Sequence, residues 1–314
     1  MTQSLQDVRK SIVLTLAYSA QFKHGLSISQ LYTRLVTKKP ISNFDFNQAL
    51  QEFLNQGLVI KKGDSYQLRG VPIRSFPSID SKRQEIQSLV SFISKIPWVS
   101  AVIITGSVAV GTMKPQDDID FLIVTQPNRL WLVRPLVVLF GLSKGRRRSW
   151  SHEEPNSWCF NFWLEETELA FAQNRWSMYT AFELCQAKFV FDRDASTEIS
   201  FLRANAWVKN RLPHFFSKRM YQALQKKNRQ SNTNEQHVVT SVIYVVDFWL
   251  GSLFTFKNYV LYLVQLFYMA PHRTSEQVDL KGAFFHPRDT KKILYAGWKS
   301  ELARLLGTTG SPTK

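Results

Sequence analysis

Apolar residues recur at helical spacing in three stretches near the N-terminus: Val8–Ala20, Ser29–Thr37 and Phe46–Asn55. Ser42 stands before the third stretch and supplies a typical N-capping signal. Two short runs at 58–62 and 65–69 then flank Gly63-Asp64, a dipeptide that favours a tight turn. The pattern therefore predicts three helices followed by an antiparallel hairpin.

Three helices and a hairpin in this order are typical of a winged-helix domain, which we place at residues 1–72. A DNA-reading winged helix presents basic or amide side chains from its third helix. Here that helix carries Asp45 and Glu52 and no Lys or Arg. We therefore favour a packing or partner-docking module over a DNA reader.

The pattern changes after Pro77. An amphipathic stretch at Arg83–Ile96 predicts a helix, and the β-branched run 98–105 that follows it predicts a buried strand. Residues 118–125 predict a second strand and 157–166 a third. Together they indicate an α+β fold: a central mixed sheet with flanking helices at 81–195, and a mostly helical C-terminal region at 196–314.

Composition and charge refine this picture. The chain has 314 residues, of which 44% are hydrophobic, and only two cysteines, Cys159 and Cys185, so neither a disulfide framework nor a four-cysteine zinc site is available. No secretory signal begins the sequence, and we expect a cytoplasmic protein. The formal net charge is +16, which favours polyanionic partners.

The chemistry is concentrated in ITGSVAVGTMKPQDDIDFLIVT. Side chains alternate along a strand, so Asp118 and Asp120 share one face while Ile119 faces the core. Two carboxylates on one face repel each other unless a cation lies between them, and oxygen ligands suit Mg²⁺. Gly106 permits close backbone approach, and Ser107 is placed to contact a nucleotide phosphate. Metal-assisted phosphoryl or nucleotidyl transfer is the resulting hypothesis.

The Gly-Ser pair, the ten residues after it and the Asp-x-Asp entering the next strand resemble the signature of the DNA polymerase β-like nucleotidyltransferase superfamily. The resemblance implies that Gly106 and Ser107 bind nucleotide phosphate and that Asp118 and Asp120 ligate Mg²⁺ or Mn²⁺ in catalysis. It implies an NTP substrate. It also implies a third carboxylate on a later strand.

The sequence departs from that pattern at the third acid. In SWCFNFWLEE, if Phe160, Phe162 and Leu164 face the core, Asn161 takes the expected acid's place as the third catalytic position. An asparagine carbonyl can ligate a metal but cannot act as a base. Glu165, Glu166 and Glu168 lie farther along, and we regard them as solvent-facing acids rather than substitutes.

The order of winged helix, Gly-Ser and Asp-x-Asp motifs, NRLWLVR, a basic KGRRR loop, CFNFWL and YTAFELCQAK resembles a group of uncharacterised prokaryotic nucleotidyltransferase-domain proteins. The resemblance extends to FFHP at 284–287, where a structural His286 is favoured over zinc. Within the group's pattern Arg129 and Arg134 are nucleotide-binding candidates, and Trp131 is a stacking candidate. Tyr179 and Glu183, four apart on a helix, support the pocket floor.

The basic surplus lies mostly in residues 196–314, which hold 17 basic and 7 acidic side chains. No acid occurs between Glu198 and Glu235. The cluster there predicts an RNA-binding surface, favoured over DNA binding: Lys209, Arg211, Lys218, Arg219, Lys226, Lys227 and Arg229. A solvated helix face is the alternative. A second basic cluster, Lys144 and Arg146 to Arg148, is an exposed loop or a triphosphate contact.

The apolar stretch from Val238 to Ala270 is interrupted by Asp247 and Lys257, so we predict buried helices and do not favour contact with a membrane surface. Our first functional hypothesis is a nucleotidyltransferase that moves NMP from an NTP to an acceptor. RNA or a tRNA-like molecule is the favoured acceptor, with protein or a small molecule as alternatives. The second hypothesis is a catalytically weakened, nucleotide-binding regulatory protein that uses the winged helix to bind DNA or a partner.

Overall fold

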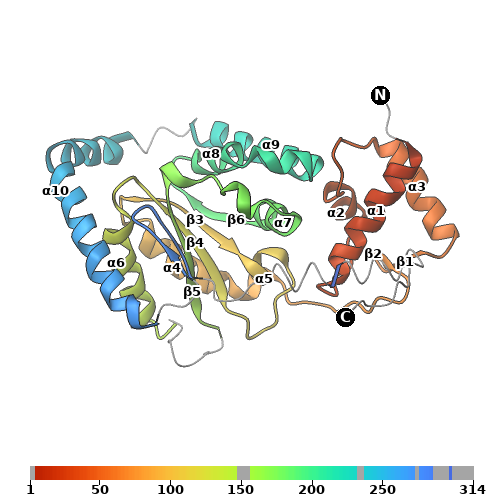
Figure 1. The fold of residues 1–314 in the computed structure, drawn as a ribbon, viewed down its shortest axis with the longest axis horizontal. Helices are drawn as coiled ribbons and strands as arrows, with labels where there is room; N and C mark the ends of the chain where they lie inside the picture. The colour runs from red at the N-terminus through yellow and green to blue at the C-terminus, as the bar shows by residue number, and fades with distance from the viewer. Residues whose placement is uncertain (1–3, 147–155, 232–236, 273–275, 286–296, 299–314) are drawn as a thin grey trace.

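The fold was obtained as a computed structural model (Figure 1), which describes residues 4–146, 156–231, 237–272, 276–285 and 297–298. For residues 231, 237–249 and 272 it describes the backbone alone. Arg147, Arg148, His286 and Pro287, which figured in the predictions above, lie outside the described residues.

The N-terminal module contains three helices and a hairpin. Its elements are α1 (Leu5–Ala20), α2 (Ile28–Thr33), α3 (Asn43–Asn55), β1 (Val59–Lys62) and β2 (Ser65–Leu68). The side chains of Ser4, Ser27 and Ser42 accept backbone hydrogen bonds at the three helix starts, and Ser27 forms a full capping box with Gln30. The apolar faces of the helices meet in one core that includes the fully buried Ile12.

The second predicted helix is shorter in the structure, because α2 ends at Thr33 rather than Thr37. Tertiary contacts replace the missing turn. The amide of Val36 donates to Oγ1 of Thr15 at 2.9 Å, and the amide of Thr37 donates to the carbonyl of Arg211 at 3.0 Å. Each amide is satisfied outside a helix, so helical spacing alone overestimated the element.

A six-stranded mixed sheet forms the centre of the molecule, in the order β6-β3-β4-β5-β8-β7. Its strands are β3 (Val99–Thr105), β4 (Ile119–Thr125), β5 (Trp158–Glu165), β6 (Lys188–Asp192), β7 (Gln277–Val278) and β8 (Gly282–Phe284). The β4–β5 pair is parallel, and the other pairs are antiparallel. The C-terminal region therefore contributes two strands to the sheet as well as helices.

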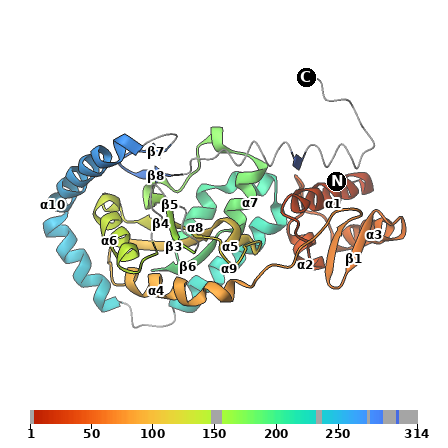
Figure 2. The ribbon, with the colours of Figure 1, turned by 90° about the horizontal axis from the view of Figure 1, so that it is seen from below.

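Helices cover both faces of this sheet (Figures 1 and 2). They are α4 (Arg83–Ile93), α5 (Gly106–Val110), α6 (Leu130–Ser143), α7 (Met178–Gln186), α8 (Thr197–Ala204), α9 (Pro213–Ser231) and α10 (His237–Met269). Ala101 and Ile103 of β3 pack on the α7–α9 side, whereas Val102 and Ile104 pack on the α4 and α6 side. This alternation makes β3 apolar throughout, as a strand buried on both faces must be.

The alternation breaks within β5. Phe162 and Leu164 pack on the α7–α9 side, but Phe160 packs on the opposite side. The three do not share a face, because the register with β4 shifts between Asp120 and Leu122. Such an irregularity redirects side chains locally, and here it falls beside the predicted site.

Candidate functional site

Asp118 and Asp120 lie at the start of β4. Asp120 is paired across the sheet with Thr105, the last residue of β3, so the aspartates stand beside the turn that follows it. Oδ1 of Asp118 accepts from the amide of Ser157 at 2.9 Å and from its hydroxyl at 3.0 Å. Oδ2 accepts from Sγ of Cys159 at 3.4 Å. The start of β5 thereby fixes the orientation of the first carboxylate.

Asn161 lies beside the second carboxylate. Its Nδ2 donates to Oδ1 of Asp120 at 2.7 Å. Because β5 runs parallel to β4 and starts level with it, Asn161 is carried to the same end of the sheet as Asp120. The residue expected at the place of the third acid is thus an amide whose side chain contacts a carboxylate.

Gly106 is constrained twice. Its φ is +66°, a left-handed conformation that favours glycine, and a Cβ added there would overlap Oδ2 of Asp120. The Asp-x-Asp strand and the Gly-Ser turn are therefore packed directly against each other, and this packing is possible because position 106 has no side chain.

Glu183 of α7 approaches the same turn from the other side. Its carboxylate accepts a hydrogen bond from the Gly106 backbone. Burial, and then the charge of Asp120, raise the pKa of Glu183 to about 7, against the opposing effect of that hydrogen bond. Tyr179, one turn earlier, has its pKa raised by burial and by the charges of Glu183 and Asp120. The structure thus brings both helix residues to the predicted site.

Ser107 is held by a residue that the motif does not include. Its hydroxyl donates to Oδ2 of Asp117 at 2.9 Å, and the same oxygen accepts from the amide of Lys114 at 2.9 Å. Asp117 therefore fixes the loop that joins the Gly-Ser turn to β4. The available signal was its position directly before Asp118, which a search for Asp-x-Asp passes over.

Arg129 and Arg134 are not brought to this site. They follow the opposite end of β4, where Thr125 pairs with Val99. Arg129 is buried, with its guanidinium 5.3 Å from the ring centre of Phe254 in α10. Arg134 donates to Oε1 of Gln265 at 2.7 Å and lies 4.8 Å from the ring centre of Phe285. Trp131 is fully buried, and its indole donates to the carbonyl of Leu280 at 2.9 Å.

The alternative third acids also lie at that far end. Glu165 pairs with Thr125 and is buried, contrary to the expectation that it faces solvent. Its Oε1 accepts from the amide of Asn128 at 2.8 Å, so it caps the chain entering α6. Burial raises its pKa, and the amides of residues 128–130 oppose that effect. Glu166 is exposed, and Glu168 pairs with Lys281 at 3.2 Å.

The basic cluster of the C-terminal region divides into two kinds of residue. Arg219 is engaged internally: it pairs with Glu198 at 2.5 Å and donates to the carbonyls of Cys185 and Ala187, which end α7. Arg211 is half-buried over the ring of Trp207. The exposed members are Lys209, Lys218, Lys226, Lys227 and Arg229, four of them on α9.

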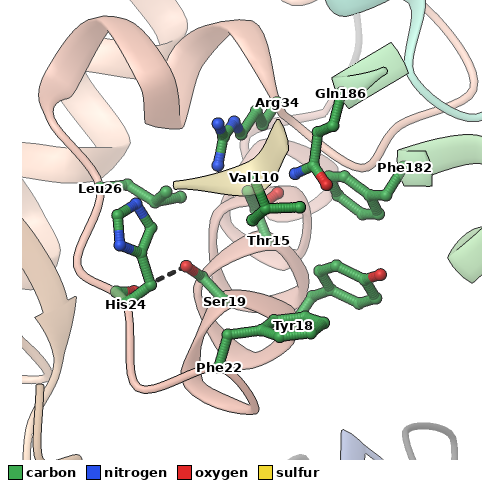
Figure 3. A pocket seen from close by; sticks show the side chains of 10 residues that line it. All are labelled: Thr15, Tyr18, Ser19, Phe22, His24, Leu26, Arg34, Val110, Phe182 and Gln186. Atoms are coloured by element: carbon green, nitrogen blue, oxygen red, sulfur yellow. Dashed lines mark hydrogen bonds between the residues drawn. The ribbon is translucent and has the colours of Figure 1, made fainter. Parts of the chain in front are cut away.

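The N-terminal module contacts α7 close to the site. The ring of Tyr18 stacks on Phe182, the residue before Glu183, at 4.0 Å and 11°. A cavity of about 10 Å³, room for one water molecule, lies at this junction between α1, α2, α5 and α7 (Figure 3). Arg34 and His24 line it (Figure 3). Burial lowers the pKa of both, that of Arg34 to about 10, and the charge of Arg34 lowers the pKa of His24 further.

The donor set at the site fits a divalent ion of the magnesium type. Asp118 and Asp120 supply carboxylate oxygens, and Asn161 carries an amide beside them. Over the described ranges, no group of three or more His, Cys, Asp and Glu side chains is arranged to hold a metal. Mg²⁺ commonly binds through one or two carboxylates and takes its other ligands from water and substrate phosphates. The site suits such an ion and does not resemble an all-protein metal cage.

Comparison with known proteins supports this location for the chemistry. Residues 83–176 match the family model of the nucleotidyltransferase domain. The match covers α4 to β5 and includes Gly106, Ser107, Asp118, Asp120 and Asn161. No curated protein and no solved structure gives a significant match to the chain. The central part of the chain therefore carries a nucleotidyltransferase domain, and transfer of an NMP group is the general class of activity that it supports.

Proposed function

We propose that this protein is a metal-dependent nucleotidyltransferase, which transfers NMP from an NTP to an acceptor and releases pyrophosphate. The observation that carries the proposal is the convergence of Asp118, Asp120 and Asn161 beside the Gly106 turn, within the matched domain. The proposal includes an NTP as substrate. It also includes a cytoplasmic location, because NTPs are abundant there.

The positions of these residues support the following proposed roles. Asp118 and Asp120 would hold Mg²⁺ or Mn²⁺, which supplies charge neutralisation at the phosphates. Gly106 and Ser107 contact the triphosphate, and Glu183 fixes the Gly106 turn through its backbone hydrogen bond. An acceptor oxygen bonds to the α-phosphorus while the bond to pyrophosphate breaks. The acceptor's proton leaves to water, because Asn161 has no basic atom and both aspartates would be metal ligands. The far-end Arg129 and Arg134 have structural roles in this proposal.

For the acceptor we propose RNA, with tRNA-like molecules foremost. The support is the row of exposed cations Lys218, Lys226, Lys227 and Arg229 along α9. The N-terminal module serves as a winged helix that docks a partner. Its third helix keeps no cation on its surface, and Glu52 there pairs with Arg9 of α1.

The test is transfer of label from each α-³²P NTP into total RNA or protein, with Mg²⁺ or Mn²⁺. We expect Asp118→Asn and Asp120→Asn each to lower incorporation about a hundredfold or more, because each removes a metal ligand. Arg134→Gln is the matched control and should retain transfer. Label that enters protein or a small molecule would correct the acceptor, and absence of transfer under every condition would refute the enzyme.

One observation favours a second candidate, a nucleotide-binding regulator with weakened catalysis: the third position donates an amide hydrogen bond to Asp120. Asn161→Asp separates the two candidates. If Asn161 weakens catalysis, the aspartate should raise turnover about tenfold or more, since it adds a base. If the native site is complete, the added charge beside Asp120 should leave turnover equal or lower.

A further inference from the structure

The stretch 238–270 was predicted to form buried helices, but over residues 250–268, where side chains are described, one face of α10 is apolar and exposed. Large side chains at alternating spacings of three and four form a stripe, with 39–85% of each exposed: Leu253, Phe256, Val260, Leu263 and Phe267. Exposed Leu250, Tyr259, Val264 and Tyr268 flank it. Apolar patches of this extent on a folded protein mark interaction surfaces.

The opposite face of α10 is fixed on α6. Oδ1 of Asn258 accepts from the amide of Trp131 at 2.9 Å, and Nε2 of Gln265 donates to the carbonyl of Trp131 at 3.0 Å. Asn258 is itself buried. These polar contacts set the rotation of the helix, so the stripe is held outward and cannot turn into the core.

Helix α6 lies beside α10 in both views (Figures 1 and 2), and it also carries exposed apolar side chains. It exposes Leu136, Leu139 and Leu142, which are 43–60% accessible and three residues apart. The exposed Lys144 follows them at the end of the helix. We refer to the exposed apolar side chains of α6 and α10 as the α6–α10 face.

The chain's own C-terminal segment does not cover this face where it is described. Trp298 donates from Nε1 to the carbonyl of Leu14 at 3.3 Å and packs edge-on against Tyr18. Both partners belong to α1, at the opposite end of the molecule from α10 (Figure 2).

The charges beside the stripe distinguish between two possible occupants, a partner helix and a lipid surface. The chain has no acidic residue between Asp247 and Glu276, and the exposed Lys257 stands at the edge of the stripe. A coiled-coil partner is normally selected by charges of both signs beside the seam, and α10 offers none that are acidic. Exposed leucine and aromatic side chains, with Lys257 beside them and Lys144 at the end of α6, suit an anionic lipid surface.

We propose that the α6–α10 face binds the surface of an anionic membrane, with α10 lying in the interface plane. The described apolar stretch of α10, residues 250–268, is about 28 Å long and would rest along its length. No helix in the described part of the chain is long and apolar enough to cross a membrane, so the contact is peripheral. The inference does not depend on transferase activity.

The test is co-sedimentation of the full-length chain with phosphatidylcholine vesicles, with and without phosphatidylserine. Wild type should bind vesicles that contain phosphatidylserine about tenfold more tightly than vesicles of phosphatidylcholine alone. Phe256→Ser and Phe267→Ser should each weaken that binding about tenfold by removing an inserted aromatic ring. Phe44→Ser is the matched control: Phe44 is 76% exposed on α3, far from this face, and its loss should leave binding unchanged.

Circular dichroism of each variant establishes that the fold is retained. Binding that is absent, or equal on neutral and anionic vesicles, would overturn the proposal. So would a stable dimer in light scattering that dissociates in Phe267→Ser, because a second copy would then be the occupant. Vesicle binding that appears only after removal of residues 299–314 would assign the face to the chain itself.

Discussion

The two ends of strand β4 carry comparable numbers of charged residues but use them differently. At its start, Asp118 and Asp120 accept hydrogen bonds from neutral groups of Ser157, Cys159 and Asn161. Beyond its end, Glu165 and the two arginines of 129–134 are directed to backbone amides, an amide side chain and aromatic rings. The groups that contact the two aspartates leave their carboxylate oxygens gathered at one end of the sheet, whereas the far-end charges stabilise local structure. The comparison teaches that charge alone does not mark a site; the kind of partner does.

The largest expected effect comes from adding a Cβ atom at position 106, beside the start of β4. Gly106→Ala combines a strained φ of +66° with overlap on Oδ2 of Asp120, so transfer should fall below detection and metal affinity should fall with it. Gly111→Ala is the matched control, since φ is +82° there and nothing lies within 4 Å of the added carbon. It should cost about 1 kcal/mol of unfolding free energy and keep transfer. If both variants lose similar activity, backbone strain alone explains the loss, and contact with Asp120 is not needed to account for it.

At the far end the expected effect is on stability. Glu165→Leu removes the acceptor for the Asn128 amide and leaves buried donors unsatisfied, which should lower the unfolding free energy by about 1–3 kcal/mol. Turnover at a temperature where the variant is folded should stay near wild type. Denaturant unfolding and the transfer assay together decide this. A hundredfold loss of turnover in a folded Glu165→Leu variant would instead show that this end of the sheet contributes to catalysis.

The smallest expected effect concerns the junction with the N-terminal module and the response to acid. Burial lowers the pKa of His24 and of His214, whose Nε2 accepts from the amide of Ile41 at 2.9 Å. The unfolded chain therefore binds protons first, and the stability that these groups contribute above about pH 6.5 is lost as pH falls. The raised pKa values of Glu183, about 7, and of Glu165 have the opposite sign, and the stability that they contribute is lost as pH rises.

Thermal melts between about pH 7 and pH 5 measure this balance. Glu183 contributes equally to both proteins, so on acidification we expect the change in Tm to be more negative by a few degrees for wild type than for a His24→Gln, His214→Gln variant. Parallel curves for the two proteins would mean that neither histidine is held neutral by the fold.

Much of the central fold could be predicted from the sequence, because its determinants are local. The β-branched run at Val99–Thr105 and the alternation around Ile119 specify strands by composition and period, and the observed β3 and β4 follow them. The three helices and the hairpin of the N-terminal module also appear in the predicted order, although α2 ends at Thr33 rather than Thr37. The nucleotidyltransferase domain was likewise predicted from a motif with fixed spacing, and the family match confirms it.

The errors arose where distant segments meet. The fate of Glu165 depends on the start of α6, and that of Arg219 on the end of α7, neither of which has a local signal. Asn161 was placed beside the aspartates from a pattern of three core residues that do not share a face. Its position nevertheless agrees with the structure, because the parallel pairing of β5 with β4 brings it there. Periodicity identifies strands, but register decides which side chains meet.

The contact between Ser107 and Asp117 has a consequence for how a phosphate could arrive. A serine hydroxyl has one proton to donate, and here it is already committed to the carboxylate of Asp117 at 2.9 Å. If the proposed triphosphate binds Ser107, its oxygen competes with Asp117 for that proton, and the loop then keeps only the hydrogen bond between Asp117 and the Lys114 amide. Phosphate binding at Ser107 would thus be coupled to the mobility of the loop between α5 and β4, because both depend on the Ser107 hydroxyl proton.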